Sequence, residues 1–257
     1  MSEPIDAPVA SLPADPSRPW AGTRAVGAPR AQLTVARYGR LAVGAVVLGA
    51  ILVGAGFLVR FGSDALIHAD GLASRWFVVQ RTDTWDAITL VGSDLAKTVT
   101  VVGVASVMFV TLRIWLRRWD ESIMLATALG GELLIFLTVT AIVKRPRPPV
   151  FRLDEAPPTS SFPSGHTAAA VVAYVFIAYI LWRYLANRYV ATVACVLLSA
   201  VPIAVAVARM YRGAHFPTDV IGGALLGIVW LTFVIRTLVP KGQPERVSSS
   251  GDDVRVS

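Results

Sequence analysis

Long runs of apolar residues, separated by short polar stretches, dominate this sequence. Of the 257 residues, 54% are hydrophobic and only 16% are charged, which is too apolar for an ordinary soluble domain. A run of about 20 apolar residues is long enough to cross a bilayer as a helix. We therefore predict an all-α fold, a polytopic membrane protein with six transmembrane helices in a bundle. The six predicted spans are Leu41–Val59, Leu95–Trp115, Ile123–Val143, Pro163–Leu181, Tyr189–Ala208 and Pro217–Leu238.

The two ends of the chain differ in composition from the central part. Residues 1–37 are rich in Ala, Pro and Arg without apolar periodicity, and residues 241–257 are rich in Ser. Both are predicted to be disordered tails, which leaves 38–240 as one transmembrane domain. Within it, Phe61–Ser93 has Trp and Phe beside charges and is predicted to form short helices at the membrane surface. No cleavable signal peptide is expected, because the first apolar run begins only at about Leu41.

The basic residues predict an orientation in the membrane. Six spans place both termini on one side, and arginines cluster in both tails, at Arg113–Glu121 and at Arg183–Arg188. The positive-inside rule makes that side cytoplasmic, so the net charge of +7 reflects topology rather than nucleic-acid binding. The chain is expected in the plasma (inner) membrane, with Lys144–His166 and Arg209–Asp219 facing the periplasm or cell exterior. The single cysteine, Cys195, allows no intramolecular disulfide.

The stretch from Arg209 to Asp219 carries the clearest chemistry. It holds His215, one of only three histidines, with Arg209 six residues before it and Asp219 four residues after it. If Pro217 lies in the first turn of a helix, Asp219 is expected to reach back to one ring nitrogen of His215. The other nitrogen is then free to attack, as in an activated nucleophile, and Arg209 favours an anionic centre such as a phosphoryl group. The alternative is an ordinary polar loop between two membrane helices.

Two further polar stretches fall on the same predicted face. Lys144–Arg147 offers three cations stiffened by proline, which suits phosphate oxygens, although an interfacial anchor of basic residues has the same composition. Pro163–His166 begins the fourth predicted span, where the free amides of a first helical turn point at a ligand. There Ser164 adds a hydroxyl donor, and His166 is placed to protonate a departing oxygen. The alternative for this stretch is a plain helix-capping turn.

Together the three stretches resemble the type-2 phosphatidic acid phosphatase family, the lipid phosphate phosphatases, which includes bacterial undecaprenyl-diphosphate phosphatases and phosphatidylglycerophosphatase-type enzymes. Pro163–His166 matches the family's second motif completely, and Arg147-Pro148 fits the first. The third motif is matched in type and spacing by Arg209, His215 and Asp219.

The sequence departs from the family pattern at two positions. Thr140 stands where the family has a lysine, and the nearest lysine is Lys144, one helical turn later on a similar face. Ala208 stands where the family has a serine, so one hydroxyl donor is missing. Neither change touches the nucleophile or the proton donor, and activity is expected to survive both.

The resemblance implies hydrolysis of a lipid phosphate or diphosphate through a phosphohistidine, without metal or other cofactor. His215 attacks phosphorus while Asp219 holds its other ring nitrogen, and His166 protonates the leaving oxygen and then activates water. Charge stabilisation of the phosphoryl oxygens is the largest expected catalytic effect. The expected phosphate-binding residues are Lys144, Arg147, Ser164, Gly165 and Arg209. No cluster of Asp, Glu, His or Cys at metal-ligand spacing competes with this interpretation.

Several substrates and two rival functions stay open. An isoprenoid carrier diphosphate of the undecaprenyl or decaprenyl type is the first expectation. Phosphatidic acid, diacylglycerol diphosphate and phosphatidylglycerol phosphate are the alternatives. A non-hydrolytic lipid-phosphate binder or flippase on the same fold is a rival from another class, and so is a small ion-coupled transporter.

Only Glu132 supports a transporter. It lies near the middle of the third predicted span, where an unpaired carboxylate is costly. A structural hydrogen bond to a neighbouring helix is the expected explanation for this carboxylate.

Overall fold

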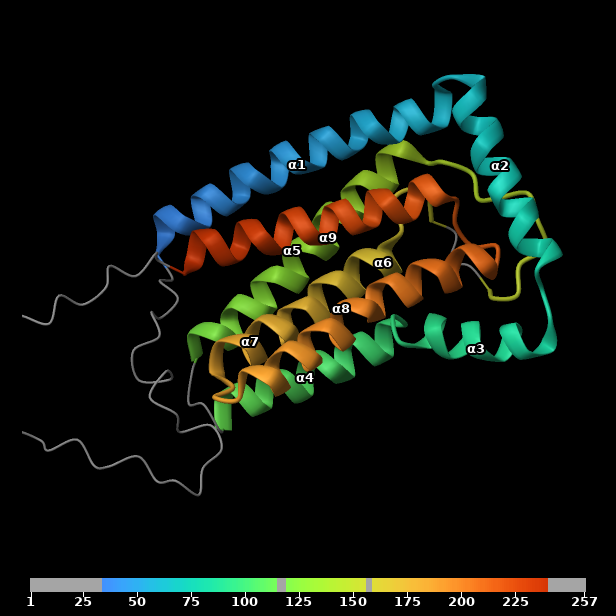
Figure 1. Cartoon of the computed structure of the whole chain (residues 1–257). Coiled ribbons are helices and arrows are strands. Elements are labelled where there is room, and N and C mark those ends of the chain that lie inside the picture. Colours follow the sequence, from blue (N-terminus) through green and yellow to red (C-terminus); the bar gives the residue numbers. More distant parts are fainter. Residues whose placement is uncertain (1–33, 115–118, 156–158, 240–257) are drawn as a thin grey trace, which may run out of the picture.

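The computed structural model describes residues 34–114, 119–155 and 159–239, and all regular structure within these ranges is helical (Figure 1). This confirms the predicted all-α class. The predicted tails fall almost entirely outside the described residues. The helices are α1 (Val35–Phe61), α2 (Asp64–Val79), α3 (Asp83–Asp94), α4 (Thr98–Ile114), α5 (Trp119–Val143), α6 (Gly165–Ala170), α7 (Phe176–Tyr184), α8 (Arg188–Tyr211) and α9 (Pro217–Leu238).

Five helical segments of the described chain are long and apolar enough to cross a membrane. They are α1, α5, α8, α9 and the continuous segment Gly165–Tyr184. In that segment a π-helical turn, Val171–Val175, joins α6 to α7. A sixth crossing requires α3 and α4 together, which are bent by 49° at their junction. The chain is thus a polytopic membrane protein of five or six spans.

Several predicted span boundaries differ from the observed helix ends by a few residues. The first predicted span began at Leu41, but α1 begins at Val35, because Arg37 donates hydrogen bonds to the carbonyls of Thr237 and Leu238 at the end of α9 (2.9 and 3.0 Å). The second predicted span began at Leu95, whereas α4 begins at Thr98. Apolar length alone therefore started the first span too late and the second too early.

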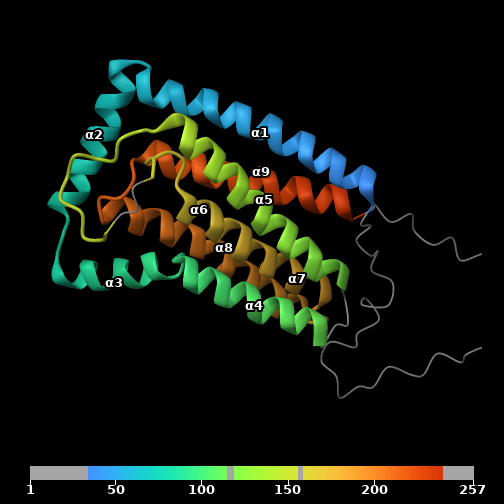
Figure 2. The same cartoon turned by 180° about the vertical axis from the view of Figure 1, so that it is seen from behind.

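The bundle has two distinct ends. The first turn of α1 and the last turn of α9 lie side by side at one end, and α2 and α3 lie at the other (Figures 1 and 2). There α2 runs across the end of the bundle, between α1 and α3. The short helices predicted within Phe61–Ser93 are thus present as α2 and α3. They cover the end of the bundle to which the loops after α5 and α8 also run.

Small residues on α9 bring it close to α6 and the π-helical turn. A Cβ on Gly223 would lie 2.3 Å from the carbonyl oxygen of Ser164, and one on Gly227 would lie 2.6 Å from the Cβ of Val171. Neither position has room for a side chain, so the helices pack closely there. The packing holds the start of α6 against the start of α9, where two of the three predicted motifs lie.

Candidate active site

The turn between α8 and α9 fixes Arg209 and His215 relative to each other. Gly213 has a φ of 76°, which favours glycine, and its N–H donates to the carbonyl of Met210 (3.0 Å). The N–H of Ala214 donates to the carbonyl of Arg209 (3.0 Å), so α8 ends in a Schellman motif. Pro217 then occupies the first turn of α9, as predicted. Two rigid helix ends therefore hold the arginine and the histidine.

The hydrogen bonds of His215 determine which ring nitrogen is free. Its Nδ1 lies 2.8 Å from the carbonyl oxygen of Ser161, which only accepts, so Nδ1 carries the proton. Its Nε2 lies 3.4 Å from Nη1 of Arg147, which only donates. Both contacts agree on one tautomer, in which Nε2 holds the lone pair. The side chain is 3% exposed, so this nitrogen meets only what enters the site.

Asp219 orients His215 less directly than the sequence predicted. Its Oδ2 lies 3.8 Å from Nδ1 of His215, beyond hydrogen-bond distance, and the Ser161 carbonyl takes the predicted place. Asp219 instead accepts hydrogen bonds from the Ser161 hydroxyl and from the Phe216 N–H (2.8 Å), the latter as a capping box at the start of α9. The carboxylate thus supplies negative charge beside the histidine, and Ser161 touches both residues.

The sequence analysis missed a buried ion network behind Asp219. Arg145 bonds Asp219 Oδ1 through Nη1 (2.5 Å) and Asp70 Oδ2, on α2, through Nη2 (2.7 Å). Thr218 bonds both Arg145 (2.8 Å) and Asp70. Arg145 is 5% exposed and Asp70 is 2% exposed. Within the first basic motif, Arg145 therefore neutralises two carboxylates of the protein and is not available to bind substrate.

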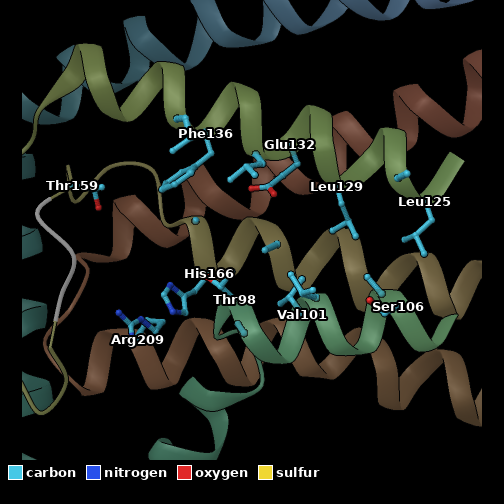
Figure 3. A pocket seen from close by; sticks show the side chains of 18 of the residues that line it. Thr98, Val101, Ser106, Leu125, Leu129, Glu132, Phe136, Thr159, His166 and Arg209 are labelled. Atoms are coloured by element: carbon cyan, nitrogen blue, oxygen red, sulfur yellow. The ribbon is translucent and has the colours of Figure 1, made fainter. Parts of the chain in front are cut away.

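Three predicted residues meet His215 at one cavity. Arg147, His166 and Arg209 all line it, and so does Gly165 at the start of α6. Arg147 is held by the Ala214 carbonyl (2.9 Å) and the Thr159 hydroxyl (3.3 Å). Figure 3 shows the His166 ring beside the Arg209 guanidinium. The structure thus places two guanidinium groups and two imidazoles around one space.

A second carboxylate that the sequence analysis missed orients Arg209. Asp154, in the loop after α5, bonds Nη1 of Arg209 (3.0 Å) and Nη2 of Arg212 (2.7 Å). The Ser93 hydroxyl donates to Asp154 (3.1 Å) and accepts from Arg209 Nη1 (2.8 Å). Although burial opposes its ionisation, the hydrogen bond and charge of Arg212 keep the pKa of Asp154 below its ordinary value. The anionic Asp154 therefore fixes one edge of Arg209, while Arg209 still lines the cavity.

The structure does not bring Lys144 and Ser164 to the cavity. Lys144 follows the last residue of α5 with a φ of 49°, its side chain is exposed, and it is absent from the lining. Ser164 is fully buried, and its hydroxyl caps α6 through the Thr167 N–H (3.4 Å) and Thr167 hydroxyl (2.9 Å). Thr140, where the family has lysine, is buried against the Ser160 carbonyl (3.5 Å). None of these three residues therefore supplies a cation to the cavity in place of the missing lysine.

The cavity extends from these polar groups deep between the helices. Its volume is about 750 Å³. One end holds the histidines and arginines, and the other runs between α4 and α5 toward Leu125 and Ser106 (Figure 3). Its far walls are apolar, formed by Val101, Ala105, Phe109, Leu125, Leu129 and Leu133. Such a space accommodates an anionic head with a hydrocarbon tail.

The tautomer of His215 leads to a prediction about pH. Burial lowers the pKa of His215 below its ordinary 6.5, since the ring has no room for solvent around a charge. A lowered pKa keeps the ring neutral, with Nε2 free, at pH values where a solvent-exposed histidine is already protonated. We expect the acid limb of kcat/KM to fall below pH 6.5, measured by phosphate release in detergent across pH 4–8. An acid limb above pH 6.5 would contradict a buried neutral nucleophile.

Comparison with known proteins shows that this chain is similar to the PAP2 superfamily and to a phosphatidylglycerophosphatase. The family model described as PAP2 superfamily matches residues 121–242. Phosphatidylglycerophosphatase B of Bacillus subtilis (strain 168) is 29% identical over 183 residues, which are 68% of this chain and 85% of that protein. The three polar motifs and helices α6 to α9 fall within the range of the family model, which also covers nearly all of α5.

Two solved structures share the fold. The transmembrane PAP2 type phosphatidylglycerolphosphate phosphatase of Bacillus subtilis superposes with a TM-score of 0.66 at 24% identity, over 75% of this chain and 92% of that one. Aquifex aeolicus LpxE gives a TM-score of 0.50 at 22% identity, over 63% of this chain and 92% of that one. Each superposition covers 92% of the known structure, so the helical arrangement is common to all three proteins.

Proposed function

We propose that this chain, which is similar to the PAP2 superfamily over residues 121–242, hydrolyses a lipid phosphate through a phosphohistidine formed on His215. One observation carries the proposal. The unprotonated Nε2 of His215 faces the same cavity as His166, Arg147 and Arg209. A nucleophile, a proton donor and two cations around one space are the groups that phosphoryl transfer needs.

In the first step, Nε2 of His215 attacks phosphorus and the P–O ester bond breaks. The departing alkoxide takes a proton from His166, whose charged form is favoured when the phosphate dianion lies beside it. Arg147, Arg209 and the free amides at the start of α6 stabilise charge on the phosphoryl oxygens. The proton on Nδ1 stays on the ring and is donated in a hydrogen bond to the Ser161 carbonyl. The carboxylate of Asp219, 3.8 Å from Nδ1, stabilises the positive charge of the phosphohistidine ring.

In the second step, His166 accepts a proton from water, and the oxygen of that water attacks phosphorus. The P–N bond breaks, and its electron pair returns to Nε2 of His215. The sum of both steps is ester plus water giving alcohol plus phosphate. No residue changes its final protonation state, so the site is ready for another substrate.

The shape of the cavity and the named relative bear on the substrate. The apolar part of the cavity lies between α4 and α5, within the bundle, where a lipid tail is the natural occupant. The similarity to a phosphatidylglycerophosphatase favours a glycerol-based lipid phosphate over the isoprenoid carrier diphosphate that the sequence analysis placed first. A glycerolipid monophosphate is therefore the proposed substrate, with the isoprenoid diphosphate as the second candidate.

The orientation of the enzyme is part of the proposal. Both ends of the described chain lie at one end of the bundle, and the cavity's polar groups lie toward the other (Figure 1). The arginine-rich tails favour a cytoplasmic location for the first end. The active site would then face the periplasm or cell exterior.

Phosphate release from purified protein in detergent tests this function. We expect release from glycerolipid monophosphates in excess chelator, because arginines and helix amides neutralise the phosphoryl group in the proposed mechanism. Sealed vesicles with the N-terminus inside should hydrolyse lipid added from outside. A protein that binds these lipids without releasing phosphate would instead be the binder or flippase considered above, and activity lost in chelator would contradict the metal-free mechanism.

A further inference from the structure

Glu132 is the one acidic residue of the described chain that lines the deep cavity, and it has no partner there. It is 3% exposed, and its Oε1 accepts no hydrogen bond from any described residue. The predicted hydrogen bond to a neighbouring helix is therefore absent. Burying a polar oxygen without a donor is unfavourable, so the fold gains nothing from this carboxyl group. A donor arriving with a ligand would satisfy it.

The place of Glu132 in the cavity suggests which part of a substrate it meets. Phe136, one turn along α5, lies against the start of α6: a Cβ on Gly165 would come within 2.8 Å of its ring. Glu132 is four residues further from that end, about 6 Å deeper along the helix. Leu129 and the apolar wall of the cavity lie further still from the histidines (Figure 3). Glu132 thus lies between the phosphate-binding groups and the tail-binding part of the cavity.

We propose that Glu132 is a specificity-determining residue that accepts a hydrogen bond from a hydroxyl group a few bonds away from the phosphoryl group of the lipid. This inference rests on the proposed function and adds a preference for lipids that carry a free hydroxyl near the phosphate. A carboxyl oxygen accepts such a bond whether or not the group is ionised. A lipid with a free glycerol hydroxyl next to its phosphate ester offers the donor. Prenyl phosphates and fully esterified diacylglycerol phosphate offer none.

A pair of lipids that differ in one hydroxyl tests the inference directly. The first is a 1-acylglycerol 3-phosphate with a free 2-hydroxyl, and the second is its 2-deoxy analogue, the 3-acyloxypropyl phosphate with the same acyl chain. Wild-type protein should have the higher kcat/KM for the hydroxyl-bearing lipid. Glu132→Leu should lower this ratio about 10-fold or more, because the buried hydroxyl loses its acceptor. Its kcat/KM for the deoxy lipid should stay the same or rise.

Two further variants separate recognition from packing. Glu132→Gln keeps an acceptor oxygen at the same position, so it should retain most of the discrimination that Glu132→Leu loses. Leu129→Val changes the neighbouring apolar wall without changing its polarity, so it should change kcat/KM for both lipids by the same factor. The melting temperature of Glu132→Leu should equal or exceed that of wild type, since an unpaired buried oxygen is removed.

The outcomes distinguish this inference from the proposed function. If wild type hydrolyses neither lipid, the proposed lipid phosphatase activity on glycerolipids fails. If wild type hydrolyses both and Glu132→Leu leaves their ratio unchanged, the activity stands and the role of Glu132 is wrong. An unchanged ratio with a lowered melting temperature would assign Glu132 a purely structural role, which also overturns the inference.

Discussion

Replacing His215 with alanine is expected to lower the rate of phosphate release by roughly 10⁴- to 10⁶-fold, since no other group is placed to form the covalent intermediate. His166 lies at the same cavity, but its proposed role is proton transfer to the leaving oxygen. The variant should still fold, because the His215 side chain makes two hydrogen bonds, from Nδ1 to the Ser161 carbonyl (2.8 Å) and from Arg147 to Nε2 (3.4 Å), and neither belongs to a helix. Initial rates with a glycerolipid monophosphate, together with melting temperature in detergent, measure both effects.

Covalent trapping makes this prediction specific. Rapid quenching at alkaline pH with phosphorus-labelled lipid should leave label on wild type, because a phosphoramidate bond is labile in acid. No label should remain on His215→Ala. His68→Ala is a matched control, since His68 is exposed on α2 and should keep both activity and labelling. Turnover within tenfold of wild type in the His215 variant would show that another residue attacks phosphorus.

Replacing Arg145 with alanine is expected to have the largest effect on stability, about 3–5 kcal/mol in the free energy of unfolding. The variant leaves Asp70 and Asp219 buried without their shared cation, at 2% and 0% exposure. It also frees Asp219, which caps α9 and lies beside His215, so activity should fall with stability. Thermal unfolding in detergent, followed by circular dichroism, should show a melting temperature lower by roughly 10 °C or more.

Two comparisons test the cause of that loss. Arg75→Ala removes an exposed arginine from α2 and should shift the melting temperature by no more than about 1–2 °C. Arg145→Lys restores a cation but cannot bond both carboxylates in the planar geometry of a guanidinium, so its stability should be intermediate. An Arg145→Ala variant as stable as Arg75→Ala would mean that the buried network contributes nothing to the fold.

Much of the helical plan could be predicted from the sequence, since apolar length alone reports membrane spans. The predicted spans from Ile123, Tyr189 and Pro217 correspond to α5, α8 and α9. The predicted span from Leu95 corresponds to α4, which is long enough to cross the membrane only together with α3, across a bend of 49°. Polar residues such as Arg37 lengthen helices beyond their apolar cores, and a hydropathy pattern does not register them.

The candidate site was predictable where its residues follow one another at short spacing. The positions of Arg209, His215 and Pro217 depend on one local turn, so the residue types and their spacing were sufficient to predict that they lie together. The partners that lie far along the chain were not predictable. The carbonyl of Ser161 has no side-chain signature, and it lies 54 residues before the histidine that it orients.

The same reason explains the missed carboxylates. Asp70 and Asp154 lie in segments that hold other charged residues, and no local pattern distinguishes them from acidic side chains exposed to solvent. Only the folded arrangement shows that each neutralises an arginine of a motif. Conversely, the three cations within Lys144–Arg147 looked equivalent in sequence. In the structure Lys144 is exposed, Arg145 is buried in an ion network and Arg147 lines the cavity.

The ion network behind Asp219 also bears on how the protein is made. Asp70 precedes Arg145 by 75 residues, and Asp219 follows Arg145 by 74. At a synthesis rate of about 5–20 residues per second, several seconds or more pass before the last partner leaves the ribosome. The proposed nucleophile, its neighbouring carboxylate and the contact to α2 all lie at the start of α9. In the proposed mechanism, a nascent chain that has not yet inserted α9 therefore lacks the groups that hydrolyse membrane lipid.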